Sequence, residues 1–205
     1  MAHIPDGVLS GPVLVAGGVL AAGGIALALR RLDEEEIPRT AILSAAFFAV
    51  SLFAVPVGPS SVHLLLGGLM GLILGSAIFP AIFVALLLQS VMFGFGGLTS
   101  LGVNTFNIAL PGAAIGMLLA PAIARASASR AAVLAGVGSA LAVAGTGTLV
   151  ALSLALSSND YAASAKVMIA TYVPLMCIEG LVAGFCVSFV KKVKPELLAP
   201  VPAGA

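Results

Sequence analysis

Long apolar runs constrain the fold of this chain more than any other feature. Seven of them are long enough to cross, or nearly cross, the hydrocarbon core of a bilayer. Only 8% of the residues are charged, whereas a soluble domain carries roughly a quarter. We therefore predict an all-α, polytopic membrane protein in which residues 1–205 form a single transmembrane domain. The seven runs are 12–29, 41–57, 63–78, 80–94, 108–125, 131–156 and 166–190.

The number of spans depends on the third and fourth runs, which are short and divided by Pro80. They could form a tight hairpin or a partly re-entrant segment, so a bundle of about seven transmembrane helices is predicted, with six as the alternative. With seven spans, eight basic residues fall on one side, which is then cytoplasmic. The N-terminus is therefore expected outside and the C-terminus in the cytoplasm. The eight are Arg30, Arg31, Arg39, Arg125, Arg130, Lys191, Lys192 and Lys194.

The chain has two histidines, His3 and His63, and this topology puts both on the external side. A terminal amine, the deprotonated amide of an early histidine and its ring nitrogen can close fused chelate rings, and a second imidazole can fill a remaining corner. Flat nitrogen coordination favours Ni(II) or Cu(II). The plainer interpretations are an exposed terminal residue for His3 and a helix-cap or interfacial histidine for His63. Their shared side favours a metal site.

The segment Gly94–Asn107 is rich in glycine and carries no charge. A solvated linker would carry more charge, and non-helical backbone at membrane depth must be buried in protein or line a cavity. We therefore predict a loop folded into the bundle. Asn104 and Asn107 are expected to bond backbone groups or to support the histidines from behind.

Two polar residues lie inside predicted spans, Glu179 and Gln89. Intramembrane carboxylates are functional candidates, although a structural hydrogen bond to a neighbouring helix is the plainer interpretation. In an alternative function, a metal-independent transporter or channel for a small organic solute, both would line the path. An intramembrane enzyme is disfavoured because no His-Glu-x-x-His pair is present. With so few basic residues, the expected partner is the lipid bilayer and not nucleic acid.

Six segments share a pattern with a known family: His3–Gly7, Ser61–Leu64, Leu88–Gln89, Phe95–Thr99, Leu101–Asn107 and Ile178–Gly180. Together they resemble the CbiM/NikM family, the substrate-capturing membrane subunits of energy-coupling-factor transporters for cobalt and nickel. The resemblance implies uptake driven by separate ABC ATPase subunits and a transmembrane coupling subunit, with or without a small accessory membrane subunit, in a bacterial or archaeal inner membrane. The chain has no Walker-type loop, so we expect that it is not the ATPase. Ni(II) or Co(II) is then the transported substrate, and no cofactor is expected.

In that family the metal is held by the terminal amine, the backbone nitrogen and ring of an N-terminal histidine, and a second histidine; His3 and His63 match these positions. The family usually begins Met-His, whereas here Ala2 intervenes. If Met1 is removed, Ala2 supplies the amine. If Met1 stays, Met1, Ala2 and His3 could supply four nitrogens unaided, and His63 would be displaced or the site distorted. Both arrangements stay open, and nickel is favoured over cobalt by the flat geometry.

Overall fold

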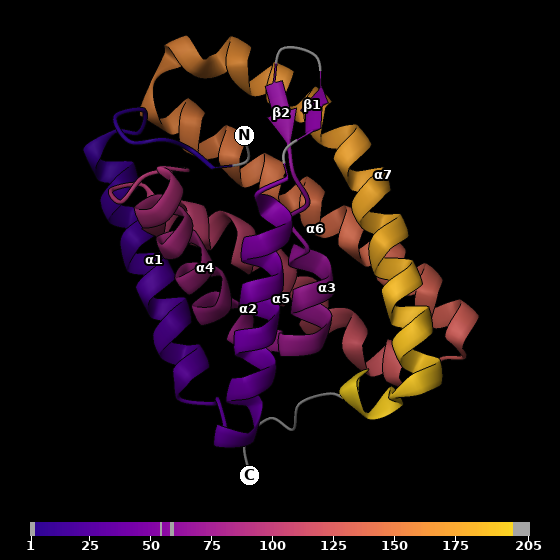
Figure 1. Cartoon of the computed structure of the whole chain (residues 1–205). Coiled ribbons are helices and arrows are strands. Elements are labelled where there is room, and N and C mark those ends of the chain that lie inside the picture. The colour runs from indigo at the N-terminus through magenta and orange to yellow at the C-terminus, as the bar shows by residue number, and fades with distance from the viewer. Residues whose placement is uncertain (1–2, 54, 58–59, 199–205) are drawn as a thin grey trace.

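The computed structural model describes residues 3–53, 55–57 and 60–198. Short 3-10 turns lie between the first and second α-helices, the third and fourth, and the sixth and seventh. One antiparallel pair of short strands precedes the third helix, with Val55 opposite Val62. The predicted helical fold is confirmed, with this hairpin added (Figure 1). The elements are α1 (Gly11–Leu29), η1 (Glu34–Glu36), α2 (Ile37–Ser51), β1 (Val55–Val57), β2 (Ser60–Val62), α3 (Gly67–Leu74), η2 (Gly75–Ala77), α4 (Ile78–Phe93), α5 (Leu101–Arg125), α6 (Ala128–Ser157), η3 (Asn159–Tyr161), α7 (Ala162–Val193) and η4 (Pro195–Leu198).

Five helical segments of the described chain are long and apolar enough to cross a membrane. One of them, Gly67–Phe93, is bent, because Gly75 has a positive φ of 54° and begins the 3-10 turn between α3 and α4. Both of its ends return to the same neighbour: His63 stacks on His3, and Gly96 lies against the β-carbon of His3. The α3–α4 segment therefore turns back on itself. The five are 11–29, 67–93, 101–125, 128–157 and 171–193.

Helix α3 is short and lies at the centre of the bundle, packed backbone to backbone on α5. A β-carbon added to Gly71 would lie 1.9 Å from the carbonyl oxygen of Gly112, and one added to Gly116 would lie 2.0 Å from that of Gly71. Small residues allow helices in lipid to approach this closely. The contact gives the segment just before α3, which carries His63, a fixed base.

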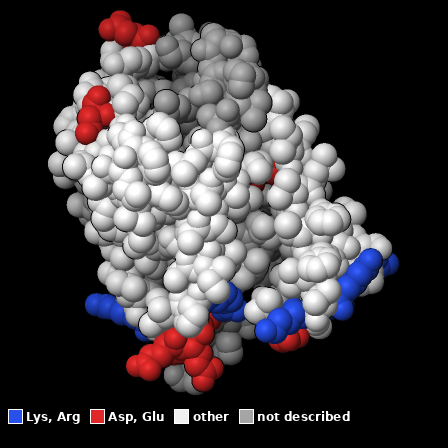
Figure 2. All heavy atoms as spheres, in the orientation of Figure 1, with Lys and Arg blue, Asp and Glu red and all other residues white. Residues whose placement is uncertain are grey.

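Charged side chains are distributed unevenly along the bundle. In Figure 2 the lysines and arginines gather at the lower end, where the α1–α2 and α5–α6 connections and the end of α7 lie in Figure 1. Beyond this end, the outer surface of the helices is apolar. Large side chains such as Phe185 and Leu118 are more than 70% exposed there. An apolar belt with basic residues at one end is the pattern of a membrane-spanning bundle.

Three sequence-based boundaries were wrong. The run 41–57 is not one helix, because α2 ends at Ser51 and β1 follows. Within 63–78 only residues 67–74 form an α-helix before the 3-10 turn. The predicted loop 94–107 ends early, since α5 begins at Leu101 and contains both asparagines. A carboxylate from the distant residue Asp6 binds the amides just before α5, a tertiary contact that local pattern does not reveal.

Candidate metal site

The two histidines meet at one end of the bundle. His3 belongs to the N-terminal arm, residues 3–10, and His63 to the turn formed by residues 63–66, called here the His63 turn. Their rings stack with centroids 4.7 Å apart and planes inclined by 28°. His3 is 5% exposed and His63 4%. Met1 and Ala2, the other predicted ligands, lie outside the described residues.

Three ring nitrogens of this pair have no hydrogen-bond partner among the residues that the structure describes. Nδ1 of His63 donates to the carbonyl oxygen of Leu64 at 3.0 Å, which leaves its Nε2 with a lone pair. That Nε2 and both ring nitrogens of His3 are buried, and no described residue bonds them. Buried polar atoms are nearly always hydrogen-bonded. Lone pairs left open beside one another are therefore available for a ligand that accepts electron density, such as a metal ion.

Burial also keeps both rings uncharged. The pKa of His3 is lowered to about 3. The larger cause is its removal from water, and the second is repulsion by the charge that His63 would carry. Burial likewise lowers the pKa of His63, although its bond to Leu64 opposes the change. The neutral imidazole is the form that binds metals. The pair is thus in its ligating form at neutral pH.

Asn104 on α5 fixes the backbone next to His3. The amide nitrogen of Ile4 donates to Asn104 Oδ1 at 2.9 Å, and Asn104 Nδ2 donates back to the Ile4 carbonyl at 3.0 Å. The hydroxyl of Ser100 donates to the same carbonyl at 2.6 Å. These bonds hold the backbone of the N-terminal arm against the first turn of α5.

Asp6 anchors the other part of the arm. Its carboxylate accepts hydrogen bonds from the backbone amides of Leu98, Thr99 and Ser100 at 3.0–3.2 Å, and from the Thr99 hydroxyl. The Thr99 hydroxyl, more than these amides, lowers the pKa of Asp6. A β-carbon at Gly97 would lie 2.0 Å from the Asp6 carboxylate, so only glycine fits there.

Asp6 and Ser100 were not among the sequence-based site residues. Asp6 lies in the segment His3–Gly7, which carries the family resemblance, and Ser100 lies between two such segments, Phe95–Thr99 and Leu101–Asn107, but no local pattern pairs them. Their contacts join residues more than 90 positions apart.

The remaining predicted residues have different surroundings. Asn107 Nδ2 donates to Ser153 Oγ at 3.3 Å and so links α5 to α6. Glu179 Oε1 accepts the amides of the His63 turn. Gln89 Nε2 donates to Ser51 Oγ and to the Phe48 carbonyl, between α4 and α2. The hydrogen bonds of Glu179 and Gln89 thus do not join them into one polar site.

Within the described part of the chain, no three His, Cys, Asp or Glu side chains lie close enough to hold a metal ion. A metal bound by the two histidines would need donors of another kind. The terminal amine, which the sequence predicts as one of them, lies outside the described residues.

The chain is similar in sequence to known metal transport proteins. The family model described as CbiM, cobalt uptake substrate-specific transmembrane region, matches residues 3–197. The chain belongs to the CbiM family. A Haemophilus influenzae protein named for metal transport is 38% identical over 198 residues, 96% of each chain. The cobalt transport protein CbiM of Sorangium cellulosum is 31% identical, covering 96% of this chain and 94% of that one.

A longer relative and a solved structure complete the comparison. The fused nickel transport protein NikMN of Rhodobacter capsulatus is 31% identical, and its match covers 97% of this chain but 64% of that protein. A crystal structure of a transition metal transporter superposes with a TM-score of 0.78 over 93% of both chains, at 24% identity. This last likeness shows the fold alone.

Proposed function

We propose that this chain is the substrate-capture component of an ATP-driven nickel or cobalt uptake transporter. It would bind Ni(II) or Co(II) on the external side through the terminal amine, His3 and His63. The observation that carries the proposal is the stacked, buried histidine pair, in which three ring nitrogens have no hydrogen-bond partner among the described residues. Membership of the CbiM family, a cobalt uptake family, supports it independently.

The proposed membrane orientation has the histidine pair outside. The basic residues gather at the opposite end, which suits the cytoplasm. The turn between α3 and α4 supports seven passages through the bundle, with the N-terminus outside and the C-terminus inside. Three of the seven would be made by short helices, α2, α3 and α4. The membrane would be the cell membrane of a bacterium or archaeon.

ATP hydrolysis would take place on separate partner subunits, as the family resemblance implies. A transmembrane coupling subunit would connect them to this chain, with or without a small accessory membrane subunit. The chain itself would then act by binding and releasing the ion and would catalyse no reaction. The nickel of the fused NikMN protein and the cobalt of the Sorangium protein support either ion as the substrate.

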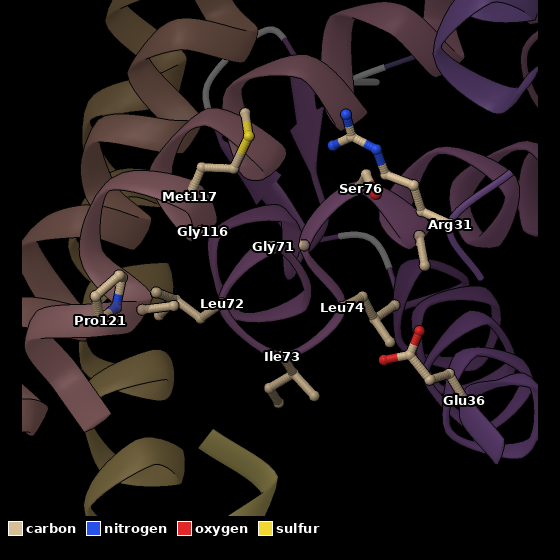
Figure 3. Close-up of a pocket in the computed structure, with 13 residues that line it drawn as sticks. Arg31, Glu36, Gly71, Leu72, Ile73, Leu74, Ser76, Gly116, Met117 and Pro121 are labelled. Atoms are coloured by element: carbon tan, nitrogen blue, oxygen red, sulfur yellow. The ribbon is translucent and has the colours of Figure 1, made fainter. Parts of the chain in front are cut away.

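The cavities give little support to a transporter for an organic solute. One of about 260 Å³ opens at the basic end, with Arg31 and Glu36 on one side and Met117 and Pro121 of α5 on the other (Figure 3). A second, of about 330 Å³, lies between α2 and α4. Neither is lined by His3, His63 or Glu179.

Calorimetric titration of the purified, unchelated protein with Ni(II) and Co(II), beside mass spectrometry of its N-terminus, tests the proposal. We expect one ion per chain, and His63→Ala should weaken binding at least tenfold, or about 1.4 kcal/mol. A wild-type protein that binds neither ion would refute the function. Unchanged affinity in His63→Ala would leave a Met1–Ala2–His3 chelate and remove His63 from the site.

A further inference from the structure

Glu179 is a buried carboxylate that the proposed ligand set does not include. It lies in α7 and is 1% exposed. Its Oε1 accepts the backbone amide of Leu66 at 2.9 Å and that of Leu65 as well. No lysine or arginine pairs with it among the residues that the structure describes. A carboxylate is costly inside a membrane and is therefore a candidate for a specific role.

The two amides belong to the turn that carries His63. They follow the histidine by two and three residues, so the carboxylate is within two peptide units of its backbone. Leu66 has φ 48° and ψ 11°, in the left-handed region, which is unfavourable for a residue with a β-carbon. Such a conformation persists where surrounding contacts impose it. The bonds from Glu179 to both amides are contacts of this kind.

The His63 turn is fixed from its other side by α3. The backbone contact of Gly71 with α5 holds that helix in place, and the Leu64 carbonyl fixes the ring of His63 through Nδ1. The direction in which Nε2 points therefore depends on the path of four residues. Glu179 of α7 forms hydrogen bonds to the backbone of this four-residue turn.

We propose that Glu179 is a positioning residue, which holds His63 against His3 by accepting the amides of Leu65 and Leu66. The proposal rests on the proposed function of the histidine pair. It requires an oxygen acceptor at the end of a side chain of this length, and no negative charge. A ligand to the metal or a carrier of protons would require the carboxylate itself.

Three substitutions separate reach from charge. Glu179→Gln keeps an acceptor oxygen at the same reach and removes the charge. Glu179→Asp keeps the charge but is about 1.5 Å shorter, one carbon–carbon bond. Glu179→Leu removes both. The measurements are the Kd for Ni(II) by calorimetry and the visible absorption spectrum of the nickel complex, which reports the ligand field and not the stability of the fold.

Glu179→Gln should bind nickel within about threefold of wild type and keep its spectrum, because both backbone hydrogen bonds remain. Glu179→Asp and Glu179→Leu should each weaken binding about 10–100-fold, the usual loss when a supporting partner of a metal ligand is removed, with a changed spectrum. If Glu179→Leu does not fold, the Gln and Asp variants still decide. Glutamine as damaging as aspartate, or aspartate equal to wild type, would overturn the proposal.

Gln89→Leu is the matched control. It also removes a buried polar side chain that joins two helices, but its partners are Ser51 and Phe48. It should bind nickel within about threefold of wild type, because the contacts it removes are made to α2 and not to the His63 turn. Equal losses in Gln89→Leu and Glu179→Leu would indicate general loosening and refute the positioning role. Absence of binding in wild type would instead refute the proposed function.

Discussion

The N-terminal arm and the His63 turn each deliver one imidazole, but they are held by different contacts. The arm is bound by polar side chains of its own and of α5, and its Asp6 carboxylate lies at the exposed surface. The His63 turn is bound by the buried Glu179 of α7 and continues into the tightly packed α3. The two segments meet through their stacked rings.

This difference indicates which half of the site opens. Segments with few buried apolar contacts and solvent-exposed hydrogen bonds open at low free energy, whereas core helices open only with the whole fold. The Asp6 end of the arm has exposed hydrogen bonds, while Ile4 and Leu9 bury the rest of the arm in a small apolar cluster on α5 and α6. Helix α3 and the His63 turn belong to the large core cluster of the bundle. We expect the arm to move as the ion enters, and His63 to stay with the bundle until α7 moves.

The sharpest way to break this comparison is to block the arm at its first atom. Acetylation or an N-terminal tag removes the terminal amine from the chelate, yet leaves α3, α5 and α7 untouched. A free amine has a pKa of about 7.7–8.0 and must be neutral to coordinate. We expect the tagged chain to insert normally and to lose nickel and cobalt uptake, measured as metal accumulation in cells that also express the partner subunits.

A tag placed after Ala205 is the control for that experiment, because it lies at the other terminus. It should leave accumulation unchanged. Equal accumulation by both tagged chains would remove the amine from the ligand set and leave the arm with a structural role only.

The two asparagines of α5 sharpen the comparison at the next level. Asn104→Ala removes both hydrogen bonds to Ile4, beside His3, and should weaken nickel binding about 10–100-fold. Asn107→Ala loses a bond to Ser153 on α6 and should change the Kd by about threefold at most. Calorimetry on both variants checks this. A larger loss for Asn107→Ala than for Asn104→Ala would contradict the assignment of the arm's support to Asn104.

The helical fold could be predicted because apolar runs and basic residues are properties of single segments. The helix boundaries could not be predicted where tertiary contacts determine them. Leu101–Asn107 contains glycine and two asparagines, which are poor helix formers, and it is helical because Asp6 satisfies the amides before it. The turn at Gly75 similarly depends on α3 finding its glycine partners on α5.

The histidine pair was predictable because the predicted topology puts the two histidines on one side, and in the structure their rings stack. The residues that hold the two histidines in place were predictable only in part. Asn104 and Glu179 stood out as polar residues in apolar surroundings, but the sequence did not indicate which backbone groups they bind. Asn107 looked equivalent to Asn104, and at 3.6 residues per turn the two lie only about 60° apart around α5. One nevertheless bonds Ile4 of the arm and the other bonds Ser153 of α6.

A smaller effect is expected at Asp6, where water competes with every hydrogen bond. Asp6→Ala removes the acceptor for Thr99 and its neighbouring amides and should weaken nickel binding by roughly three- to tenfold, the range of one or two exposed hydrogen bonds. Asp6→Asn keeps one acceptor oxygen and should lie between Asp6→Ala and wild type. The Kd from titration at one pH decides. An Asp6→Ala variant that binds as wild type would show that Asn104 and Ser100 hold the arm unaided.

The smallest expected effect is on the pH dependence of stability in the metal-free protein. It distinguishes the histidine pair from the Asp6 contacts of the arm. The pKa of His3 is lowered in the fold to about 3 and that of His63 is lowered too. The unfolded chain therefore takes up protons first, and stability is lost as the pH falls below about 6.5. The pKa of Asp6 is also lowered, but a carboxylate with a lowered pKa stabilises above its ordinary value, about 3.9, and loses this only in stronger acid.

Between pH 7 and pH 5 the histidine pair should thus destabilise the apo-protein while the Asp6 contacts persist. We expect the Tm in detergent to fall by several degrees over this interval, at roughly 2–4 °C per kcal/mol for a chain of this size. The double variant His3→Leu/His63→Leu should show a flatter dependence, because it has no imidazole to protonate. Asp6→Asn should lower the Tm at both pH values by the same amount. The opposite result would be a Tm that stays constant between pH 7 and pH 5 and falls only in the stronger acid where Asp6 titrates. It would mean that the arm opens at its exposed anchor before the buried ring of His3 takes up a proton.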